Sequence, residues 1–327
     1  MTKNTSTPNT PPISNNERFD TGDIQAARER FNARIFTTIQ SPMELIPIFK
    51  KVFPECESVL EALNQLDEIK KCFESFQPYN EAQMEKLQEA WDTQYTYESN
   101  RIEGNTLTLR ETSLIVNDGI SVGGKALREI LEAINHHAAV KIMREMAEKR
   151  QKLDVRTLLK LHQTVLRTID DRNAGFFRDV HVGIKGTTKI FPTPVKVPDL
   201  IDACFRDFET DSQTLHPLLT AARLHHRLVH IHPFSDGNGR TSRLMQNLHL
   251  LQNGFVVANL KGEDSNKIVY YDALDAADAE NYEPLYKLLI AEEKYALLRY
   301  ISMLCGGIGE EEEAKGGYFF QKINSYL

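Results

Sequence analysis

Residues 232–243, with the sequence HPFSDGNGRTSR, constrain the fold of this chain more than any other stretch. Gly237, Asn238 and Gly239 allow a sharp turn in which successive backbone N–H groups point into one concavity. A chain forms an anion site at the start of a helix in this way. We therefore expect a helix that begins near Gly239 and binds a phosphate group.

The side chains of the same stretch are suited to binding a phosphate group. Arg240 and Arg243 are three residues apart, so on a helix they share one face and can meet further phosphate oxygens. Asp236 would repel phosphate unless it holds a Mg²⁺ ion shared with a nucleotide. His232 titrates near neutral pH and can take a proton from an attacking hydroxyl.

Composition excludes several other classes of protein. Lys and Arg total 39 against 46 for Asp and Glu, a net charge of −7, which argues against a general nucleic-acid binder. The four cysteines lack CxxC spacing, so neither a zinc site nor a disulfide framework is indicated, and a reducing compartment fits. Because no apolar leader or membrane-length apolar run occurs, we expect a cytoplasmic protein without membrane contact.

The N-terminal third divides into a polar tail and a helical region. Residues 1–23 are rich in Thr, Ser, Asn and Pro and predict a disordered tail. Residues 24–97 keep a helical spacing of apolar side chains without an internal repeat. Ser99 to Gly104 then predicts a short helical turn with Glu103 in its last turn. A carboxylate is unfavourable there, so Glu103 either has a cationic partner or is a solvated loop residue.

Helical spacing continues through most of the remaining chain, and residues 306–327 predict a tail of uncertain order. His136 and His137 are expected in a helix without a ligand role. The histidines at 225, 226 and 230 do not match a helix-borne metalloprotease pair, so they are expected in the core or in support of the site. The expected helices cover residues 108–116, 127–146, 155–169, 199–210, 216–230, 239–252, 266–279 and 284–305.

One segment has the pattern of β-structure. Residues 180–194 alternate apolar and polar side chains about a turn at residues 186–188, which predicts an isolated β-hairpin. The hairpin either covers a site as a flap or caps the core. Farther on, Tyr270 and Tyr271 point to different sides of a predicted helix, so at most one can stack on a base and the other is expected in the core.

Several motifs together resemble the Fic (Fido) family of AMP-transferring enzymes. Residues 232–243 are similar to the family signature HPFx[D/E]GNGRxxR, and residues 99–105 are similar to its inhibitory motif [S/T]xxxE[G/N]. Residues 174–178 resemble the AGxxR turn before the flap, and residues 270–271 fall where the family has tyrosines beside adenine. The resemblance covers about residues 97–295 and is closest to the subgroup whose inhibitory helix precedes the core.

The resemblance implies an all-α, Fic-type helical bundle with one β-hairpin flap and an added N-terminal helical region. It divides the chain into five parts. They are a disordered tail (1–23), the N-terminal helical region (24–97), an inhibitory helix segment (98–122), the Fic core (123–295) and a C-terminal helix with a tail (296–327).

The resemblance also implies an activity. His232 would be the general base that takes the proton from a Ser, Thr or Tyr hydroxyl of a target protein, which attacks the α-phosphate of ATP while pyrophosphate leaves. Asp236 would hold Mg²⁺, and Phe234 would be buried beneath the loop. The implied nucleotide-binding residues are Asp236, Gly237, Asn238, Gly239, Arg240, Thr241, Ser242, Arg243, Tyr270, Tyr271, Lys185 and Gly186.

Regulation and partners follow from the same resemblance. Glu103 would pair with Arg243 and deny it to the γ-phosphate, so the resting enzyme would be inhibited. The flap, residues 182–192, would dock the target protein by main-chain pairing, and a homodimer is expected. The flap tip, residues 185–189, is longer than usual, and Asp278 stands where relatives often have Asn near the adenine.

Two alternatives stay open. The first is a hydrolase in which Glu103 orients a water that removes AMP from a modified protein. The second is a nucleotide-binding regulatory module with negligible turnover, although an intact His232 and Asp236 argue against it. Other donors such as UTP, GTP or a choline nucleotide also stay open, because the phosphate-binding turn at residues 237–239 does not contact the base.

Overall fold

The computed structural model describes residues 21–36, 41–183, 189–305 and 315–324. Every regular element in these ranges is helical, so the prediction of an all-α fold is confirmed there. The elements are α1 (Thr21–Phe31), η1 (Asn32–Phe36), η2 (Pro42–Glu44), α2 (Leu45–Val52), α3 (Val59–Glu74), α4 (Glu81–Ile102), α5 (Leu109–Val116), α6 (Leu127–Glu148), α7 (Val155–Leu166), η3 (Pro194–Lys196), α8 (Val197–Thr214), α9 (Pro217–Ile231), α10 (Asn238–Gln252), α11 (Asp264–Asp278), α12 (Glu283–Cys305) and α13 (Gly317–Asn324).

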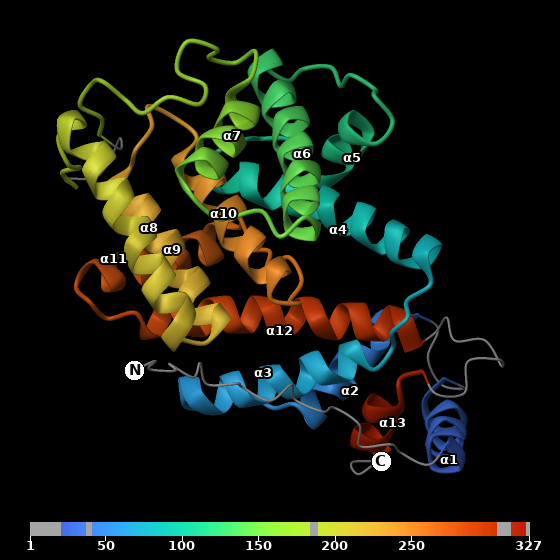
Figure 1. The fold of residues 1–327 in the computed structure, drawn as a ribbon. Helices are drawn as coiled ribbons and strands as arrows, with labels where there is room; N and C mark the ends of the chain where they lie inside the picture. The colour runs from blue at the N-terminus through green and yellow to red at the C-terminus, as the bar shows by residue number, and fades with distance from the viewer. Residues whose placement is uncertain (1–20, 37–40, 184–188, 306–314, 325–327) are drawn as a thin grey trace, which may run out of the picture.

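Helix α12 separates two groups of helices (Figure 1). It packs on α2 and α3 on the N-terminal side and on α9 and α11 on the other. Helices α4 to α11 form the larger group, and α1, α2, α3 and α13 form the smaller one. A single hydrophobic core runs through both groups, so the N-terminal helices are packed on the rest as expected.

The C-terminal part corrects the prediction of a tail. Residues 317–324 form helix α13, which packs on α1 and α3. Phe319 and Phe320 are each 1% exposed, and the ring centroid of Phe319 lies 5.7 Å from that of Phe31 and 5.5 Å from that of Phe49. Burial of these aromatic rings supplies the apolar area that orders the segment. At the other end, the expected tail over 1–23 gives way to α1 at Thr21.

Helix α4 leads directly to the predicted inhibitory motif. It starts at the N-cap Asn80, whose side chain accepts a hydrogen bond from Gln83 N, and runs unbroken for 22 residues to Ile102. The turn expected at residues 99–104 is therefore the last turn of a long helix, and α4 crosses the predicted boundary at 97/98. Glu103 is its C-cap residue, and Gly104 follows with φ +96°. That φ suits glycine and ends the helix.

Helix α10 is the central element of the larger group. It packs on α4, α6, α7 and α9, and its residues are buried from Arg240 to Leu250. The buried set includes Arg240 and Arg243, which are only 2% and 1% exposed. A helix enclosed on all sides is held at fixed distances from its neighbours. The N-terminus of α10 is therefore held in a rigid position.

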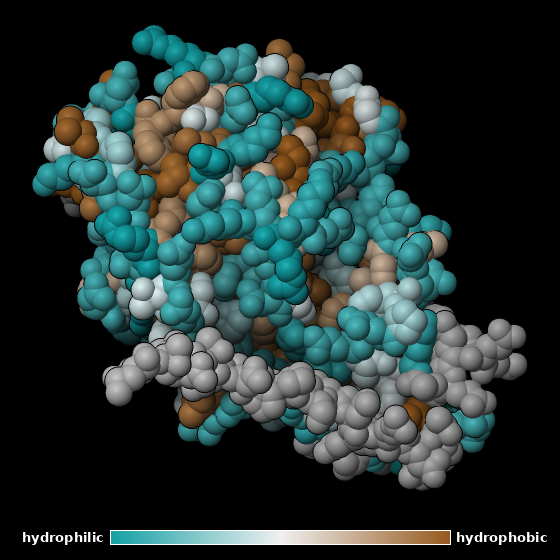
Figure 2. Space-filling model, in the orientation of Figure 1, coloured by the Kyte–Doolittle hydropathy of each residue, from teal (hydrophilic) through white to brown (hydrophobic). Residues whose placement is uncertain are grey.

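The predicted β-hairpin is not seen in the described residues. Residues 181–183 and 189–193 carry no strand, and the predicted turn, together with Lys185 and Gly186, lies outside the described residues. The described residues between α7 and α8 expose large apolar side chains at Phe176, Val180, Ile190 and Val195. Figure 2 shows apolar residues exposed among polar ones on the upper part of the molecule. Each helix in the described part of the chain is too short or too polar to span a membrane.

Candidate active site

The segment between α9 and α10 forms the centre of the site. Helix α9 ends at Ile231, and His232 adopts a left-handed conformation with φ 52°, so the chain turns sharply after the helix. Gly237, with φ 76°, then caps the start of α10. The Asn238 side chain donates to Phe234 O and accepts from Phe234 N, at 2.8 and 2.9 Å. This double hydrogen bond fixes the shape of the loop, and the helix starts where the sequence predicted.

His232 is held as a neutral imidazole. Its ring stacks on Phe191, with 4.2 Å between the ring centroids and an interplanar angle of 28°. Burial lowers the pKa of His232 to about 4. At neutral pH the imidazole is therefore unprotonated and able to accept a proton, which is what a general base requires. The contact with Phe191 has no signal in the sequence, because the two residues are 41 positions apart and no short motif links them.

Arg178 joins the signature loop to both ends of the predicted flap. Its Nε donates to His232 O at 2.8 Å, its Nη1 to Val180 O at 3.0 Å and its Nη2 to Pro192 O at 2.6 Å. Its backbone N–H also donates to Pro233 O, at 2.9 Å. Only arginine offers several donors in one fixed fork. The motif at residues 174–178 predicts Arg178 in a turn without a role of its own, and the arginine of that motif is the signal from which a role was available.

His162 supports the loop at residues 232–237, and no sequence motif assigned it a role. Its Nδ1 accepts from Gly175 N at 2.9 Å, so its Nε2 carries the proton and donates to Asp236 O at 3.0 Å. The ring lies flat on Phe234, with 3.6 Å between centroids, and Phe234 is 1% exposed. The prediction that Phe234 is buried beneath the loop is confirmed. Burial lowers the pKa of His162 to about 4, which keeps this tautomer neutral.

Glu103 contacts Arg243, as the motifs predicted. Arg243 Nη2 donates to Glu103 Oε1 at 2.7 Å and to Ser99 O at 2.9 Å, and Arg243 Nε donates to Ser99 Oγ at 3.0 Å. Burial alone would lower the pKa of the Arg243 guanidinium, but the Glu103 carboxylate outweighs it and raises the pKa. Glu103 therefore has the cationic partner expected of it, although its side chain is still 34% exposed. The role of Ser99 as a second partner follows from its position one helical turn before Glu103.

The Glu103 carboxylate occupies the start of helix α10. A Cβ built on Gly239 would lie 2.2 Å from Glu103 Oε1 and 3.0 Å from Arg243 Nη1. The first backbone hydrogen bond of the helix runs from Thr241 N to Gly237 O, so the N–H groups of Asn238 and Gly239 have no partner within the helix. A helix N-terminus of this kind attracts anions. Glu103 thus lies where the predicted phosphate would bind, and a side chain at 239 would collide with it.

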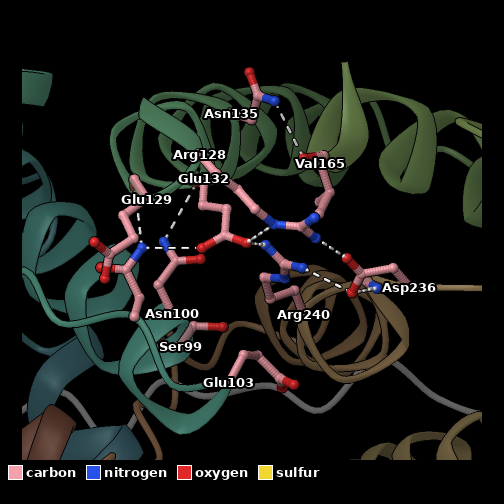
Figure 3. Close-up of polar contacts among 12 residues, drawn as sticks. Ser99, Asn100, Glu103, Arg128, Glu129, Glu132, Asn135, Val165, Asp236 and Arg240 are labelled. Carbon is pink, nitrogen blue, oxygen red and sulfur yellow. Dashed lines mark hydrogen bonds and ion pairs between the residues drawn. The ribbon is translucent and has the colours of Figure 1, made fainter. Parts of the chain in front are cut away.

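Asp236 and Arg240 belong to a separate group of charges (Figure 3). Arg240 Nη2 donates to Asp236 Oδ1 at 3.1 Å, and Arg240 Nη1 lies 3.4 Å from Glu132 Oε1. Arg128 of α6 pairs with both carboxylates, through Asp236 Oδ2 and Glu132 Oε1. Although burial opposes ionisation, Arg240 keeps the pKa of Asp236 below its usual value. Arg240 and Arg243 therefore face different acidic partners, Glu132 and Asp236 for the first and Glu103 for the second.

The residues at Asp236 fit a Mg²⁺ ion. Its carboxylate is 38% exposed and lies beside the helix N-terminus, and Mg²⁺ commonly binds one or two carboxylates together with phosphate oxygens and waters. Asp236 Oδ1 also accepts from Gly237 N at 2.6 Å. The Arg128 side chain, which pairs with Oδ2, is 59% exposed and can move into solvent. An incoming cation would take its place.

The remaining predicted residues divide into buried and exposed ones. Tyr270 is 3% exposed and its hydroxyl lies 2.8 Å from His225 Nε2, whereas Tyr271 is 43% exposed. The prediction that one tyrosine lies in the core is confirmed, and Tyr271 is the one free to stack. Thr241 and Ser242 are fully buried, with Ser242 Oγ donating to Gly239 O at 2.9 Å, so their side chains support the helix.

The geometry of the site by itself indicates a class of protein, one that binds a phosphate-bearing substrate. An all-helical core presents a neutral histidine on a strained loop and a helix N-terminus that suits an anion but is covered by Glu103. The partly exposed carboxylate of Asp236 lies beside it. Such a site suits a phosphate-bearing substrate and a proton transfer.

Comparison with known proteins shows which family the chain is similar to. Residues 152–250 match the Fic/DOC family. The chain is 32% identical over 214 residues to protein adenylyltransferase fic-1 of Caenorhabditis elegans, across 64% of this chain and 41% of that protein. It is 33% identical over 228 residues to protein adenylyltransferase Fic of Drosophila yakuba, across 69% and 45%. Residues 152–250 are therefore similar to the Fic/DOC family, and the chain spans less than half the length of these two relatives.

A solved structure agrees on the fold. A Fic domain containing signaling protein from Bacteroides thetaiotaomicron superposes with a TM-score of 0.69 at 23% identity, across 75% of this chain and 99% of that one. At this identity the likeness concerns the fold alone.

Proposed function

We propose that the chain is a protein adenylyltransferase, which transfers AMP from ATP to a Ser, Thr or Tyr hydroxyl of a target protein and is inhibited at rest by Glu103. The observation that carries the proposal is the position of the Glu103 carboxylate at the N-terminus of α10, against Gly239 and hydrogen-bonded to Arg243. The names of the two relatives support the activity.

Each residue of the site has a separate role in the proposed reaction. His232 takes the proton of the target hydroxyl, and that oxygen forms a bond to the α-phosphorus while the bond to the pyrophosphate oxygen breaks. The N–H groups of Asn238 and Gly239 and the Arg240 guanidinium bind the phosphate oxygens. Mg²⁺, held by Asp236, would neutralise phosphate charge when bound. A neutral His232 at physiological pH supports its role as base.

The inhibition has an electrostatic and a steric part. While Glu103 holds Arg243, this guanidinium is not available to the γ-phosphate, and the carboxylate repels phosphate from the helix N-terminus. Arg243 is 1% exposed and keeps two hydrogen bonds to Ser99, so it does not need to move when Glu103 leaves. Displacement of one side chain would therefore complete the γ-phosphate site.

Target docking is assigned to the segment that Arg178 holds. The exposed side chains at Val180 and Ile190, 54% and 93% exposed, offer apolar contacts beside His232. Phe191 from the same segment stacks on the His232 ring. An extended target segment bound along residues 182–192 would thus bring its hydroxyl to the base, and the flap and a homodimer are part of this proposal.

Labelling with ATP that carries a label on the α-phosphate tests the proposal. We expect Glu103→Gly to label itself or added protein strongly in the presence of Mg²⁺, and wild type weakly. The double variant Glu103→Gly/His232→Ala should fall by about 100-fold or more, the usual contribution of a general base. Glu148→Gly is the matched control, since Glu148 is likewise an exposed glutamate at the end of a helix, and it should behave as wild type.

Two results would contradict the proposal. Equal labelling by wild type and Glu103→Gly would exclude inhibition by Glu103. Labelling that persists in the double variant would exclude His232 as the base. A nucleotide-binding module without turnover would give no label in any variant while still binding ATP.

A second activity has one observation in its favour. The Glu103 charge acts on the His232 imidazole and partly opposes the fall of its pKa. Glu103 could then orient a water for removal of AMP from a modified protein. If so, wild type would release AMP from pre-labelled target faster than Glu103→Gly, the reverse of the order expected for labelling.

A further inference from the structure

Two histidines and an aspartate converge on a point outside the signature loop. His226 and His230 lie one turn apart on α9, and Asp278 is the last residue of α11. Asp278 Oδ1 lies 2.9 Å from His226 Nε2 and 2.6 Å from His230 Nδ1. The ligand atoms of all three side chains lie within 4.8 Å of one another. Two imidazole nitrogens and a carboxylate oxygen are a frequent ligand set for zinc.

The surroundings orient these groups as a metal site requires. His226 is 5% exposed, and its other ring nitrogen, Nδ1, lies 3.1 Å from the Tyr282 hydroxyl. A partner on the second nitrogen is the usual way in which a protein orients a histidine ligand. Burial lowers the pKa of His226, which favours the neutral ring that binds metal. His230 is 51% exposed, so an ion can enter from solvent.

The Asp278 carboxylate has one oxygen for each of two cations. Its Oδ2 pairs with Lys189 Nζ, while Oδ1 faces the two histidines. Although burial opposes ionisation, Lys189 and the two histidines lower the pKa of Asp278 to about 2, so the group is a carboxylate at neutral pH. Lys189 belongs to the described end of the predicted flap. An ion at Oδ1 would therefore bind next to the flap and link α9 to α11.

We propose that His226, His230 and Asp278 bind one divalent transition-metal ion of the zinc type, with water as the fourth ligand. Tetrahedral bonds of about 2.0–2.1 Å place neighbouring ligand atoms about 3.3–3.4 Å apart. Asp278 Oδ1 must therefore move away from both ring nitrogens by less than about 1 Å, and the two nitrogens, now within 4.8 Å of one another, must adopt the same spacing; side-chain rotation allows both changes. The nitrogen-rich set disfavours Mg²⁺ and Ca²⁺. The site is distinct from Asp236, and it does not depend on the proposed transferase activity.

The competing explanation is a hydrogen-bonded cluster without metal. A proton on His226 Nε2 and one on His230 Nδ1 would satisfy Asp278 Oδ1, and the Tyr282 hydroxyl would donate to His226 Nδ1. Metal and protons compete for the same nitrogen atoms, so the two explanations differ in one measurable property, the affinity for Zn²⁺.

Zinc titration of the tag-free, chelator-treated full chain tests the site. With a chromophoric chelator as competitor, we expect wild type to bind one equivalent of Zn²⁺ tightly. His230→Gln and Asp278→Asn should each lower the affinity by at least about 100-fold, since loss of a supporting residue alone costs about 10–100-fold. The matched control is Asp67→Asn, because Asp67 pairs with one histidine, His216, at 3.2 Å. Its affinity should equal that of wild type.

A third variant tests the effect of the charge next to Asp278, and Co²⁺ reports the number of ligands around the metal ion. Lys189→Met removes the positive charge next to Asp278 and should raise the Zn²⁺ affinity several-fold, with circular dichroism showing that the fold is kept. Bound Co²⁺ should give the strong visible absorption of a four-coordinate ion in wild type and lose it in Asp278→Asn. Absence of a tight equivalent in wild type, or equal affinity in wild type, His230→Gln and Asp278→Asn, would overturn the proposal.

Discussion

Replacing Gly239 with alanine tests the close approach of Glu103 to helix α10. The backbone of Gly239 is helical, so alanine would normally stabilise this position by up to about 1 kcal/mol. Here the new Cβ would lie 2.2 Å from Glu103 Oε1, so the carboxylate must move away from Arg243. Any loss of stability in this variant therefore measures the displaced contact.

The magnitude follows from the contact that is lost. A hydrogen bond between charged groups contributes about 1.5–3 kcal/mol, and the Glu103 side chain is 34% exposed, so solvent reduces this to about 1–2 kcal/mol. After the gain from alanine, we expect Gly239→Ala to destabilise by about 0–2 kcal/mol. In a Glu103→Ala background the same change meets no carboxylate and should be neutral or stabilising by up to about 1 kcal/mol.

A double-mutant cycle on thermal unfolding measures this coupling. The four proteins are wild type, Glu103→Ala, Gly239→Ala and the double variant, and the expected coupling is about 1–2 kcal/mol, or roughly 2–4 °C in Tm. Gly123→Ala is the control, because a Cβ there meets nothing within 4 Å. Effects of the two changes that add to within about 0.5 kcal/mol would refute the close approach as a source of stability.

Three further predictions concern Phe191 and Arg178 at the site, and Glu293 of helix α12, whose buried carboxyl accepts a hydrogen bond from Val256 N. Phe191→Ala should raise the pKa of His232 from about 4 toward its ordinary value, which moves the acid limb of the labelling rate to higher pH. Burial raises the pKa of Glu293 to about 8, so wild type should lose stability from about pH 4.5 to pH 8 as the unfolded state releases its proton, and Glu293→Gln should remove that slope in pH-dependent unfolding. Arg178→Lys should speed limited proteolysis within residues 180–192, because lysine cannot make the same three hydrogen bonds.

Local chemistry explains the predictions that succeeded. A helix start at Gly237 to Gly239 depends on backbone freedom and on groups within one turn, so neighbouring residues suffice to predict it. The same holds for the helix periods of α6 to α12, whose apolar spacing records the buried face. The contact of Glu103 with Arg243, 140 residues apart, was reached only because each lies in a motif similar to one in the same family.

The failures share a different cause. The order of residues 317–324 depends on packing of Phe319 and Phe320 against α1, and the low hydrophobicity of the preceding acidic run hid it. The histidines of α9 have an unremarkable spacing until α11 brings a carboxylate to them. Sequence spacing reports which side chains share a helix face, but it does not report what another helix places opposite that face.

The sequence by itself determined which chemical groups this protein brings together: a glycine-rich turn at the start of a helix, a histidine before it and an aspartate within it, all within twelve residues. Tertiary structure alone decided which partners those groups have. It placed Glu103 at the N-terminus of α10, Phe191 on His232 and Arg128 on Asp236. The physical reason is that bonding capacity belongs to each residue type, whereas burial, charge pairing and access depend on helices that meet only in the folded chain.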